Sequence, residues 1–336
     1  MKKIIFAIAI LFILSISFFI KKTIFSEIKE TSWSVQSIDT MKYSRDPSRE
    51  KLHDPSFYAV IEQQVNAIAE TGTTHISIGT PYDDEFLPIL REWVKAARSH
   101  NLNVWFRGNW SGWEEWFDYQ KITISEHIAK TEKFILSHPE LFEDGDVFTP
   151  CPECENGGPG DPRRTGDVAE YRKFLMDEYK VTSKAFKSIK KNVASNYLSM
   201  NGDVARLIMD KETTKKLDGI VTIDHYVRSP EKLVSDIKEI ARNSGGQVVL
   251  GEWGAPINDI HGSMSEEQQA VWINAAFEQL TGLPELKGMN YWTSFGGSTE
   301  LWDKKGNARK AVSVLTKYYI PSKTTILENM RKLIRL

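Results

Sequence analysis

The sequence predicts a closed (β/α)₈ barrel, the TIM-barrel fold, as its main domain. From Ser34 onward, eight short apolar runs alternate with longer segments of helical periodicity. Such alternation of β and α units implies a parallel sheet. Eight units within about 290 residues fit one barrel. An open doubly wound sheet is the alternative, but no Gly-x-Gly-x-x-Gly turn follows the first apolar run.

The expected strands are short apolar runs at residues 34–41, 75–80, 103–107, 147–149, 193–198, 220–223, 247–250 and 288–292. The helices expected after them cover residues 54–70, 85–100, 125–137, 168–189, 204–217, 230–242, 265–280 and 308–319. Asp54-Pro55 fits a helix N-cap followed by proline at the first helical position. Ser265 and Gln268 have the spacing of a capping box. The helix boundaries therefore carry signals of their own besides periodicity.

The first residues of the chain read as a membrane or export segment. Residues 4–20 form an apolar stretch of 17 without charge or proline, between two lysine pairs. This length lies between a signal-peptide core and a bilayer-spanning helix. No Ala-x-Ala-like cleavage site and no lipobox cysteine follow it. We favour an uncleaved signal anchor over residues 1–24, with a cleaved signal peptide as the alternative.

Either interpretation places the barrel, residues 32–320, outside the cytoplasm, anchored to the membrane or secreted. Residues 321–336 form a basic amphipathic tail that we expect to pack under the barrel rather than lie on the membrane. The charge is balanced, with 43 basic and 45 acidic residues, which argues against a nucleic-acid partner. We expect a monomer.

The two cysteines, Cys151 and Cys154, form one Cys-x-x-Cys pair. Such a pair is a metal half-site, a redox motif or a small disulfide loop. No second pair completes a four-thiolate zinc site, and Pro152 with the glycines that follow indicates a loop rather than a helix start. A local disulfide is our preferred interpretation in an oxidising compartment, with two free thiols as the alternative.

Polar and aromatic residues gather where the expected strands end, which in a (β/α)₈ barrel is where active sites lie. Glycines flank Glu252 after the seventh strand, so the backbone can turn sharply there. For any one of these residues a structural role is as plausible as a functional one, but together they indicate a site. They are Arg107, Asn109, Trp110, Glu153, Glu155, Asn156, Asn196, Tyr197, Asp224, His225, Tyr226, Glu252, Trp253, Tyr291 and Trp292.

This combination suits glycoside cleavage. The reaction needs two carboxyl groups, one to protonate the leaving oxygen and one to attack the anomeric carbon or activate water. Aromatic rings suit the apolar faces of sugars, and Arg, Asn, His and Tyr suit the hydroxyls. His225 is the one histidine expected at a strand end, so we expect no metal site. No Gly-x-Ser-x-Gly elbow is present, which argues against a serine hydrolase, and no cofactor is expected.

From Trp33 to Tyr319 the chain resembles the clan A glycoside hydrolases, retaining enzymes built on (β/α)₈ barrels, mainly in architecture. The Glu252 stretch resembles their nucleophile position after strand seven. Tyr291-Trp292 is similar to their sugar-platform tryptophan, and His225-Tyr226 to the pair that often flanks the nucleophile.

The resemblance also implies an acid/base glutamate at the end of strand four, usually preceded by asparagine. Here Pro152 precedes Glu153 and Cys154 precedes Glu155, so the match departs from the pattern. We choose Glu153, which lies closer to the strand, with Glu155 as the alternative. The 99 residues from Glu153 to Glu252 equal three barrel units, as strands four and seven require.

The resulting hypothesis is a retaining glycoside hydrolase acting on β-linked glycans. Glu252 attacks the anomeric carbon, and Glu153 donates a proton and later accepts one. Arg107 and Tyr226 hydrogen-bond Glu252, and Trp292 forms the floor of a sugar subsite. In the clan the asparagine before the acid/base glutamate holds the sugar 2-hydroxyl, and the resemblance implies that here this contact either passes to Asn156 or Asn196 or is absent. Other candidate substrate contacts are Tyr197 and His225, and candidate subsite tryptophans are Trp110, Trp113, Trp116, Trp253 and Trp302.

Two other functions fit the same features. One is a non-catalytic, membrane-tethered carbohydrate-binding barrel, favoured by the missing asparagine before Glu153. The other is a transglycosylase that uses the same two carboxylates. Cellulose-like, mannan-like and xylan-like chains all suit the expected site.

Overall fold

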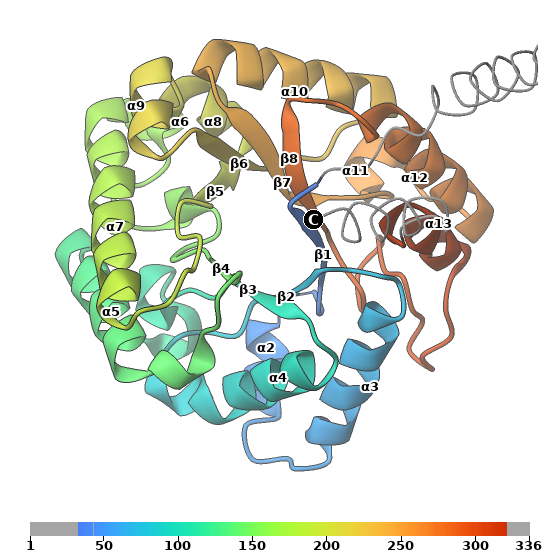
Figure 1. Cartoon of the computed structure of the whole chain (residues 1–336), viewed down its shortest axis with the longest axis horizontal. Helices are drawn as coiled ribbons and strands as arrows, with labels where there is room; N and C mark the ends of the chain where they lie inside the picture. Colours follow the sequence, from blue (N-terminus) through green and yellow to red (C-terminus); the bar gives the residue numbers. More distant parts are fainter. Residues whose placement is uncertain (1–32, 43, 321–336) are drawn as a thin grey trace, which may run out of the picture. The chain divides into compact units, whose positions relative to one another are not determined.

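A single sheet of eight parallel strands lies at the centre of the chain (Figure 1). The computed structural model describes residues 33–42 and 44–320. Neighbouring strands pair in the order β4-β3-β2-β1-β8-β7-β6-β5. The strands are β1 (Val35–Asp39), β2 (His75–Ile78), β3 (Asn103–Phe106), β4 (Val147–Phe148), β5 (Ser199–Asn201), β6 (Ile220–Asp224), β7 (Gln247–Trp253) and β8 (Leu286–Tyr291).

The two ends of this sheet meet. A parallel bridge joins Val147 in β4 to Ala194, just before β5. Phe148 N donates to Ala194 O at 2.8 Å, and Ala194 N donates to Asp146 O at 2.9 Å. With its ends linked in this way, the sheet leaves little open edge. Eight parallel strands in this arrangement confirm a TIM-type α/β fold.

Helices surround the strands as a ring (Figure 1). They are α2 (Arg45–Glu50), α3 (Phe57–Ala69), α4 (Leu87–Ser99), α5 (Ile124–Ser137), α6 (Pro162–Thr165), α7 (Val168–Ser188), α8 (Gly202–Ile208), α9 (Lys211–Lys216), α10 (Pro230–Ser244), α11 (Asn258–His261), α12 (Glu266–Leu280) and α13 (Lys310–Tyr319). The capping box of Ser265 and Gln268 at α12 is confirmed. Helix α3 begins at Phe57, later than expected, and Asp54 accepts a hydrogen bond from Ser56 N in the turn before it.

The expected fifth strand was misplaced. Residues 193–198 are mostly apolar and buried, but the regular ladder with β6 begins only at Ser199. Before that point Ala194 makes a single bridge, and Tyr197 O accepts from the Thr149 hydroxyl at 2.6 Å. Burial alone therefore did not identify the hydrogen-bonded strand.

Alternation along the strands separates two apolar clusters. In β3, Val104 and Phe106 belong to the large cluster that includes the buried faces of the helices, whereas Trp105 belongs to a separate small one. Successive strand residues face opposite sides of the sheet, so the small cluster lies inside the ring of strands. Its members are Val35, Trp105, Val147, Tyr197, Ile220 and Val249.

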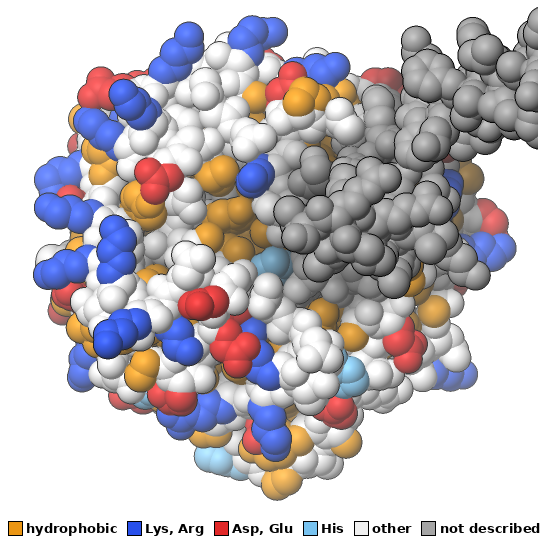
Figure 2. All heavy atoms as spheres, in the orientation of Figure 1, with side chains coloured by type: hydrophobic (Ala, Val, Ile, Leu, Met, Phe, Trp, Pro, Cys, Tyr) orange, Lys and Arg blue, Asp and Glu red, His pale blue; other side chains and the backbone are white. Residues whose placement is uncertain are grey.

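The charged surface shows no single-sign patch on the face seen in Figure 2, where acidic and basic side chains are interspersed around the helical ring. Across residues 33–42 and 44–320, no helix combines the length and apolarity needed to cross a bilayer. The expected anchor at residues 1–24 and the tail at residues 321–336 lie outside the described residues.

A buried ion pair supports the amino-terminal end of β4. Asp146 is fully buried and accepts from both terminal nitrogens of Arg98, at 2.9 and 2.5 Å. It also accepts from the backbone nitrogens of Val104 and Glu143, both at 2.8 Å. This one carboxylate ties together α4, β3 and the start of β4.

We expect Asp146→Ala to lower the free energy of unfolding by about 3 kcal/mol, because it removes the buried carboxylate of the Arg98 pair and leaves the buried Val104 N–H without its acceptor. Denaturant unfolding measures this. The control is Glu212→Ala, which removes an exposed pair with Lys216 and should cost less than about 0.5 kcal/mol. Equal effects of the two variants would contradict this role for Asp146.

Candidate active site

A cavity of about 180 Å³ opens at the carboxyl ends of the strands. Its walls come from the ends of β1, β7 and β8 and from the loops after β2, β3 and β4. The lining residues are Asp39, Met41, Ser44, Arg45, Gly79, Arg107, Glu114, Trp116, Pro152, Glu153, Asn156, Glu252 and Trp292. The two proposed catalytic glutamates therefore face the same cavity, as the strand count predicts.

Glu252 lies near the end of β7 with its side chain 22% exposed. Its Oε1 accepts from Arg107 Nη2 at 3.0 Å, and its Oε2 accepts from the Tyr226 hydroxyl at 2.9 Å. The structure thus brings Arg107 and Tyr226 to Glu252. Burial and the Asp224 charge raise the pKa of Glu252, and the Arg107 charge opposes them.

Arg107, just after β3, is 3% exposed and makes further hydrogen bonds besides the one to Glu252. Its Nη2 also donates to Asp224 Oδ2 at 3.0 Å, and its Nη1 donates to Gly251 O at 2.9 Å. Asn290 Nδ2 donates to the same Gly251 oxygen at 2.9 Å. These bonds fix the guanidinium and the backbone on which Glu252 stands.

Glu153 reaches the cavity from a turn after β4. Its φ of 46° is in the left-handed region, which costs a non-glycine residue about 1 kcal/mol. Its backbone N–H donates to Ser199 O at 3.1 Å, and its carboxylate receives a long bond of 3.4 Å from Asn156. Burial, followed by the Asp224 and Glu155 charges, raises the pKa of Glu153 to about 7. A carboxyl with such a pKa holds its proton near neutrality, as a general acid requires.

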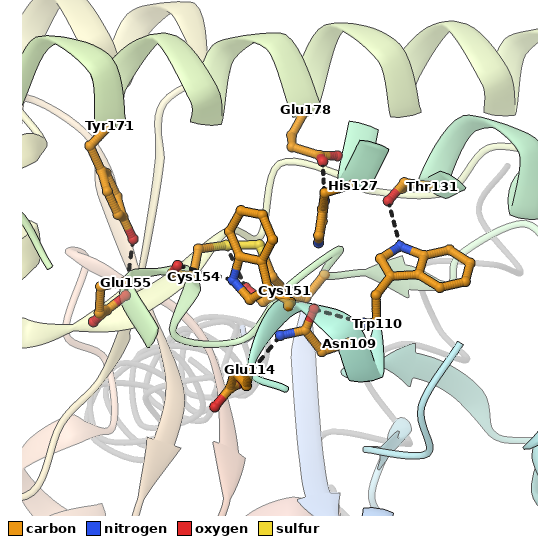
Figure 3. Close-up of a disulfide and its surroundings, with 12 residues drawn as sticks. Asn109, Trp110, Glu114, His127, Thr131, Cys151, Cys154, Glu155, Tyr171 and Glu178 are labelled. Carbon is orange, nitrogen blue, oxygen red and sulfur yellow. Dashed lines mark hydrogen bonds and ion pairs between the residues drawn. A yellow bond between two sulfur atoms is a disulfide. The ribbon is translucent and has the colours of Figure 1, made fainter. Parts of the chain in front are cut away.

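Glu155 is placed differently. It is buried and is not among the residues that line the cavity. Its Oε1 accepts from Asn201 N at 2.7 Å, and its Oε2 accepts from the Tyr171 hydroxyl at 3.0 Å (Figure 3). Both oxygens are therefore committed to holding the loop against β5 and α7.

The loop that carries Glu153 is closed by a disulfide between Cys151 and Cys154, which confirms the local disulfide interpretation (Figure 3). Trp113 packs beneath this loop and donates its indole N–H to Cys154 O at 3.2 Å. A Cβ added at Gly157 or Gly158 would collide with Trp113. The glycines after the cysteines therefore permit the close packing that holds the turn in place.

Two tryptophans line the cavity. Trp292 follows β8, and the Tyr226 ring meets it edge-on with the ring centroids 6.0 Å apart. Trp116 lies in the loop after β3, with the guanidinium carbon of Arg45 4.5 Å from its ring centroid. Both rings border the open space of the cavity.

Trp110 and Trp253 belong to the core rather than to the cavity. Trp110 is buried between Tyr82 and Phe134, and its indole N–H donates to Thr131. Trp253 is fully buried against Phe277 and Tyr291. Adjacent residues of a strand point to opposite sides, so the neighbour of Glu252 faces the helices. Trp113 and Trp302 are buried as well.

Three expected polar contacts also lie away from the cavity. Asn196 donates to Leu217 O at 3.2 Å, and Tyr197 packs edge-on against Trp105 inside the barrel. Both precede β5, which begins later than expected. His225 Nε2 lies 2.9 Å from Asp236 Oδ2 on α10, and His225 does not line the cavity.

The structure adds charged residues that sequence reasoning had not selected. Asp39 ends β1, accepts from the Ser77 hydroxyl at 3.1 Å, and has its pKa raised to about 6 by burial. Glu114 lies in the tryptophan-rich loop, where burial raises its pKa to about 7. Asp39 could have been selected from the sequence, because it stands at the last position of the first strand. Nothing in the loop sequence distinguished Glu114 or Arg45 as cavity residues.

In the described part, no three His, Cys, Asp or Glu side chains are grouped to hold a metal ion.

Comparison with known proteins agrees with this fold. No protein-family model and no curated protein matches the sequence. Among solved structures, a GH5_18 protein from Streptomyces cattleya in complex with Manβ1-4GlcNAc is 12% identical, with a TM-score of 0.61 over 86% of this chain and 80% of that one. A family 5 xyloglucanase from Paenibacillus pabuli is also 12% identical, with a TM-score of 0.60 over 86% and 99%.

A β-glycosidase, BGL167, is 13% identical, with a TM-score of 0.58 over 88% of this chain and 98% of its own. Some matched proteins are longer: the chain spans 36% of a β-glucuronidase from Bacteroides uniformis. The chain therefore has the fold of the glycoside hydrolase barrels. The resemblance to clan A glycoside hydrolases is confirmed at the level of the fold.

The placement of the tryptophans predicts that two substitutions lower stability by different amounts. Trp253→Ala should lower the free energy of unfolding by about 4 kcal/mol, because it empties a fully buried site. Trp292→Ala should cost about 1 kcal/mol or less, since its ring borders the cavity. Thermal and denaturant unfolding measure both. A larger loss of stability for Trp292→Ala would place that ring in the core.

Proposed function

We propose that the protein is a retaining glycoside hydrolase that cleaves β-linked glycans by double displacement. One observation carries the proposal: Glu252, held by Arg107 and Tyr226, shares a cavity at the carboxyl ends of the strands with Glu153. Two donors at 3.0 and 2.9 Å favour the ionised form of Glu252, whereas Glu153 receives one long contact. In the proposed resting state Glu252 is ionised and Glu153 carries the proton.

In the first step, the Glu252 carboxylate forms a bond to the anomeric carbon as the bond from that carbon to the leaving oxygen breaks. The Glu153 proton passes to that oxygen, which departs as an alcohol. In the second step, Glu153 takes a proton from water, and the water oxygen attacks the anomeric carbon. The bond to Glu252 breaks, and both carboxyls return to their starting states.

A carbohydrate substrate is further supported by Trp292 and Trp116, whose rings border the cavity. Of the structurally similar barrels, the Streptomyces cattleya protein is in complex with Manβ1-4GlcNAc, and the Paenibacillus pabuli protein is a xyloglucanase in complex with a ligand. We further propose that the enzyme acts outside the cytoplasm as a monomer, anchored or exported through residues 1–24.

The two rivals make different demands on the same cavity. Glu153 is a carboxyl with a pKa of about 7, so it holds its proton near neutrality. A non-catalytic binding barrel has no need of such a group. A transglycosylase uses both carboxyls, but it resolves the intermediate with a sugar hydroxyl in place of water. Product analysis separates these functions.

We expect Glu252→Gln and Glu153→Gln to lower kcat on the best β-glycan substrate by about 10³-fold, because each removes a reacting carboxyl. Glu155→Gln is the matched control, two residues away in the same loop, and should lose much less. Hydrolysis of a panel of β-linked oligosaccharides and aryl β-glycosides provides the measurement. A large loss in Glu155→Gln with an active Glu153→Gln would reverse the assignment of the acid.

The charges around the cavity predict a preference against acidic sugars. Four carboxyl side chains line it, with two arginines, and Arg107 is already engaged with buried Asp224 as well as Glu252. A substrate carboxylate would meet net negative charge. We expect neutral aryl β-glycosides to have kcat/KM values at least about tenfold above the matching β-glucuronide. Preferential cleavage of the glucuronide would contradict this reading of the charges.

A further inference from the structure

Asp224 is a buried carboxyl that the two-glutamate mechanism does not use. It is the last residue of β6, is 3% exposed, and stands opposite Glu252 in the register of β6 and β7. The sheet is irregular at this point, since the register shifts between Ile223 and Asp224. A charged side chain this deep is costly unless a partner of opposite charge compensates it.

That partner is Arg107. Its Nη2 donates to Asp224 Oδ2 at 3.0 Å, and its Nη1 lies 3.5 Å from Asp224 Oδ1. The same Nη2 donates to Glu252 Oε1 at 3.0 Å. One guanidinium nitrogen is thus shared between the side chain that holds it and the proposed nucleophile.

Gly251 makes this arrangement possible. A Cβ at that position would collide with Asp224 Oδ1 and with Arg107 Nη1. The glycine before Glu252 therefore leaves room for the ion pair beside the nucleophile.

We propose that Asp224 is a positioning residue for the reaction: it aims the Arg107 guanidinium at Glu252 and fixes a negative charge beside both glutamates. The inference rests on the proposed function. It assigns Asp224 two separable effects, one through the geometry of Arg107 and one through charge.

The charge effect follows from what faces Asp224. Arg107 approaches from the β3 side, the Ser199 side chain faces it from β5, and Glu252 stands beside it on β7. Its charge also acts on Tyr226 after β6, and on Glu153 and Glu155 in the loop after β4. After burial, Asp224 is the largest cause of the raised pKa of both Glu252 and Glu153. It thereby helps Glu153 to keep its proton, while Arg107 favours the ionised form of Glu252.

The test compares the parent with Asp224→Asn, which keeps an acceptor for Arg107 but removes the charge. Carbon-13 NMR titration of the Glu252 and Glu153 carboxyls, assigned with the Gln variants, needs no substrate. Both pKa values should fall by about one unit, because a like charge has been removed nearby. Asp224→Ala is a second neutral variant in case the Asn variant does not fold, and Asp224→Glu should restore the raised values.

The matched control is Asp146→Asn, a buried aspartate that binds Arg98 in the same two-pronged way at the other end of the strands. It should lower stability and leave both glutamate pKa values unchanged.

The pH profile of kcat/KM gives the second readout. The acid limb requires ionised Glu252, and the alkaline limb requires protonated Glu153. A lower pKa at either residue moves its limb to lower pH, so the whole profile of Asp224→Asn should shift downward.

If neither pKa moves while stability falls as in Asp146→Asn, Asp224 is only structural and the inference is wrong. If both values fall but the parent cleaves no β-glycoside or β-glycan, the proposed function fails and the role of Asp224 in the charge cluster stands. If the parent is a glycosidase whose profile is unmoved by Asp224→Asn, the function stands and the inference fails.

Discussion

The cavity depends on the buried guanidinium of Arg107. It lies among Asp224, Glu252 and the Gly251 carbonyl, and its own burial is compensated by these neighbours. The Coulomb attractions of Asp224 and Glu252 raise the pKa of Arg107 further, so it stays charged. Without that charge, three largely buried acidic side chains at strand ends, Asp39, Asp224 and Glu252, would repel one another. Arg107 therefore allows carboxyls to gather where the barrel brings its strand ends together.

The second constraint is the loop after β4, which must hold Glu153 in an unfavourable backbone conformation. The Cys151–Cys154 disulfide closes the turn, Glu155 ties it to β5 and α7, and the Trp113 indole supports it from below. Behind Trp113, the buried pair of His127 and Glu178 joins α5 to α7 (Figure 3). Residues held in sparsely populated backbone regions persist only when their surroundings over-determine them. The layers around Glu153 provide that support.

The barrel could be predicted because its signal is repeated: eight apolar runs and the helices between them agree with one another, and position along the chain identified Glu252 as the end of the seventh strand. Arg107, Glu153, Asn156 and Trp292 were found at the cavity for the same reason, and Tyr226 was found against Glu252. Side-chain direction was harder to predict. Trp253 sits beside Glu252 but points into the core, because one step along a strand reverses the face. Trp110, three residues after Arg107, is buried in the core as well.

The fifth strand shows a different limit. Its apolar residues are buried as expected, yet the regular ladder with β6 begins only at Ser199, and Asn196 and Tyr197 do not line the cavity. Asp224 and Gly251 stood at recognised strand ends, but their roles arise from a contact with Arg107 that is distant in sequence. Such pairings depend on the register of neighbouring strands, which local periodicity does not encode.

Trapping the intermediate tests the central claim most directly. The enzyme is incubated with a 2-deoxy-2-fluoro aryl glycoside of the sugar that it hydrolyses best, then digested and examined by peptide mass spectrometry. We predict one glycosyl group on the peptide that contains Glu252, absent from Glu252→Gln. A glycosyl group on Glu153 or Glu155, or release of a product with inverted anomeric configuration, would contradict the account.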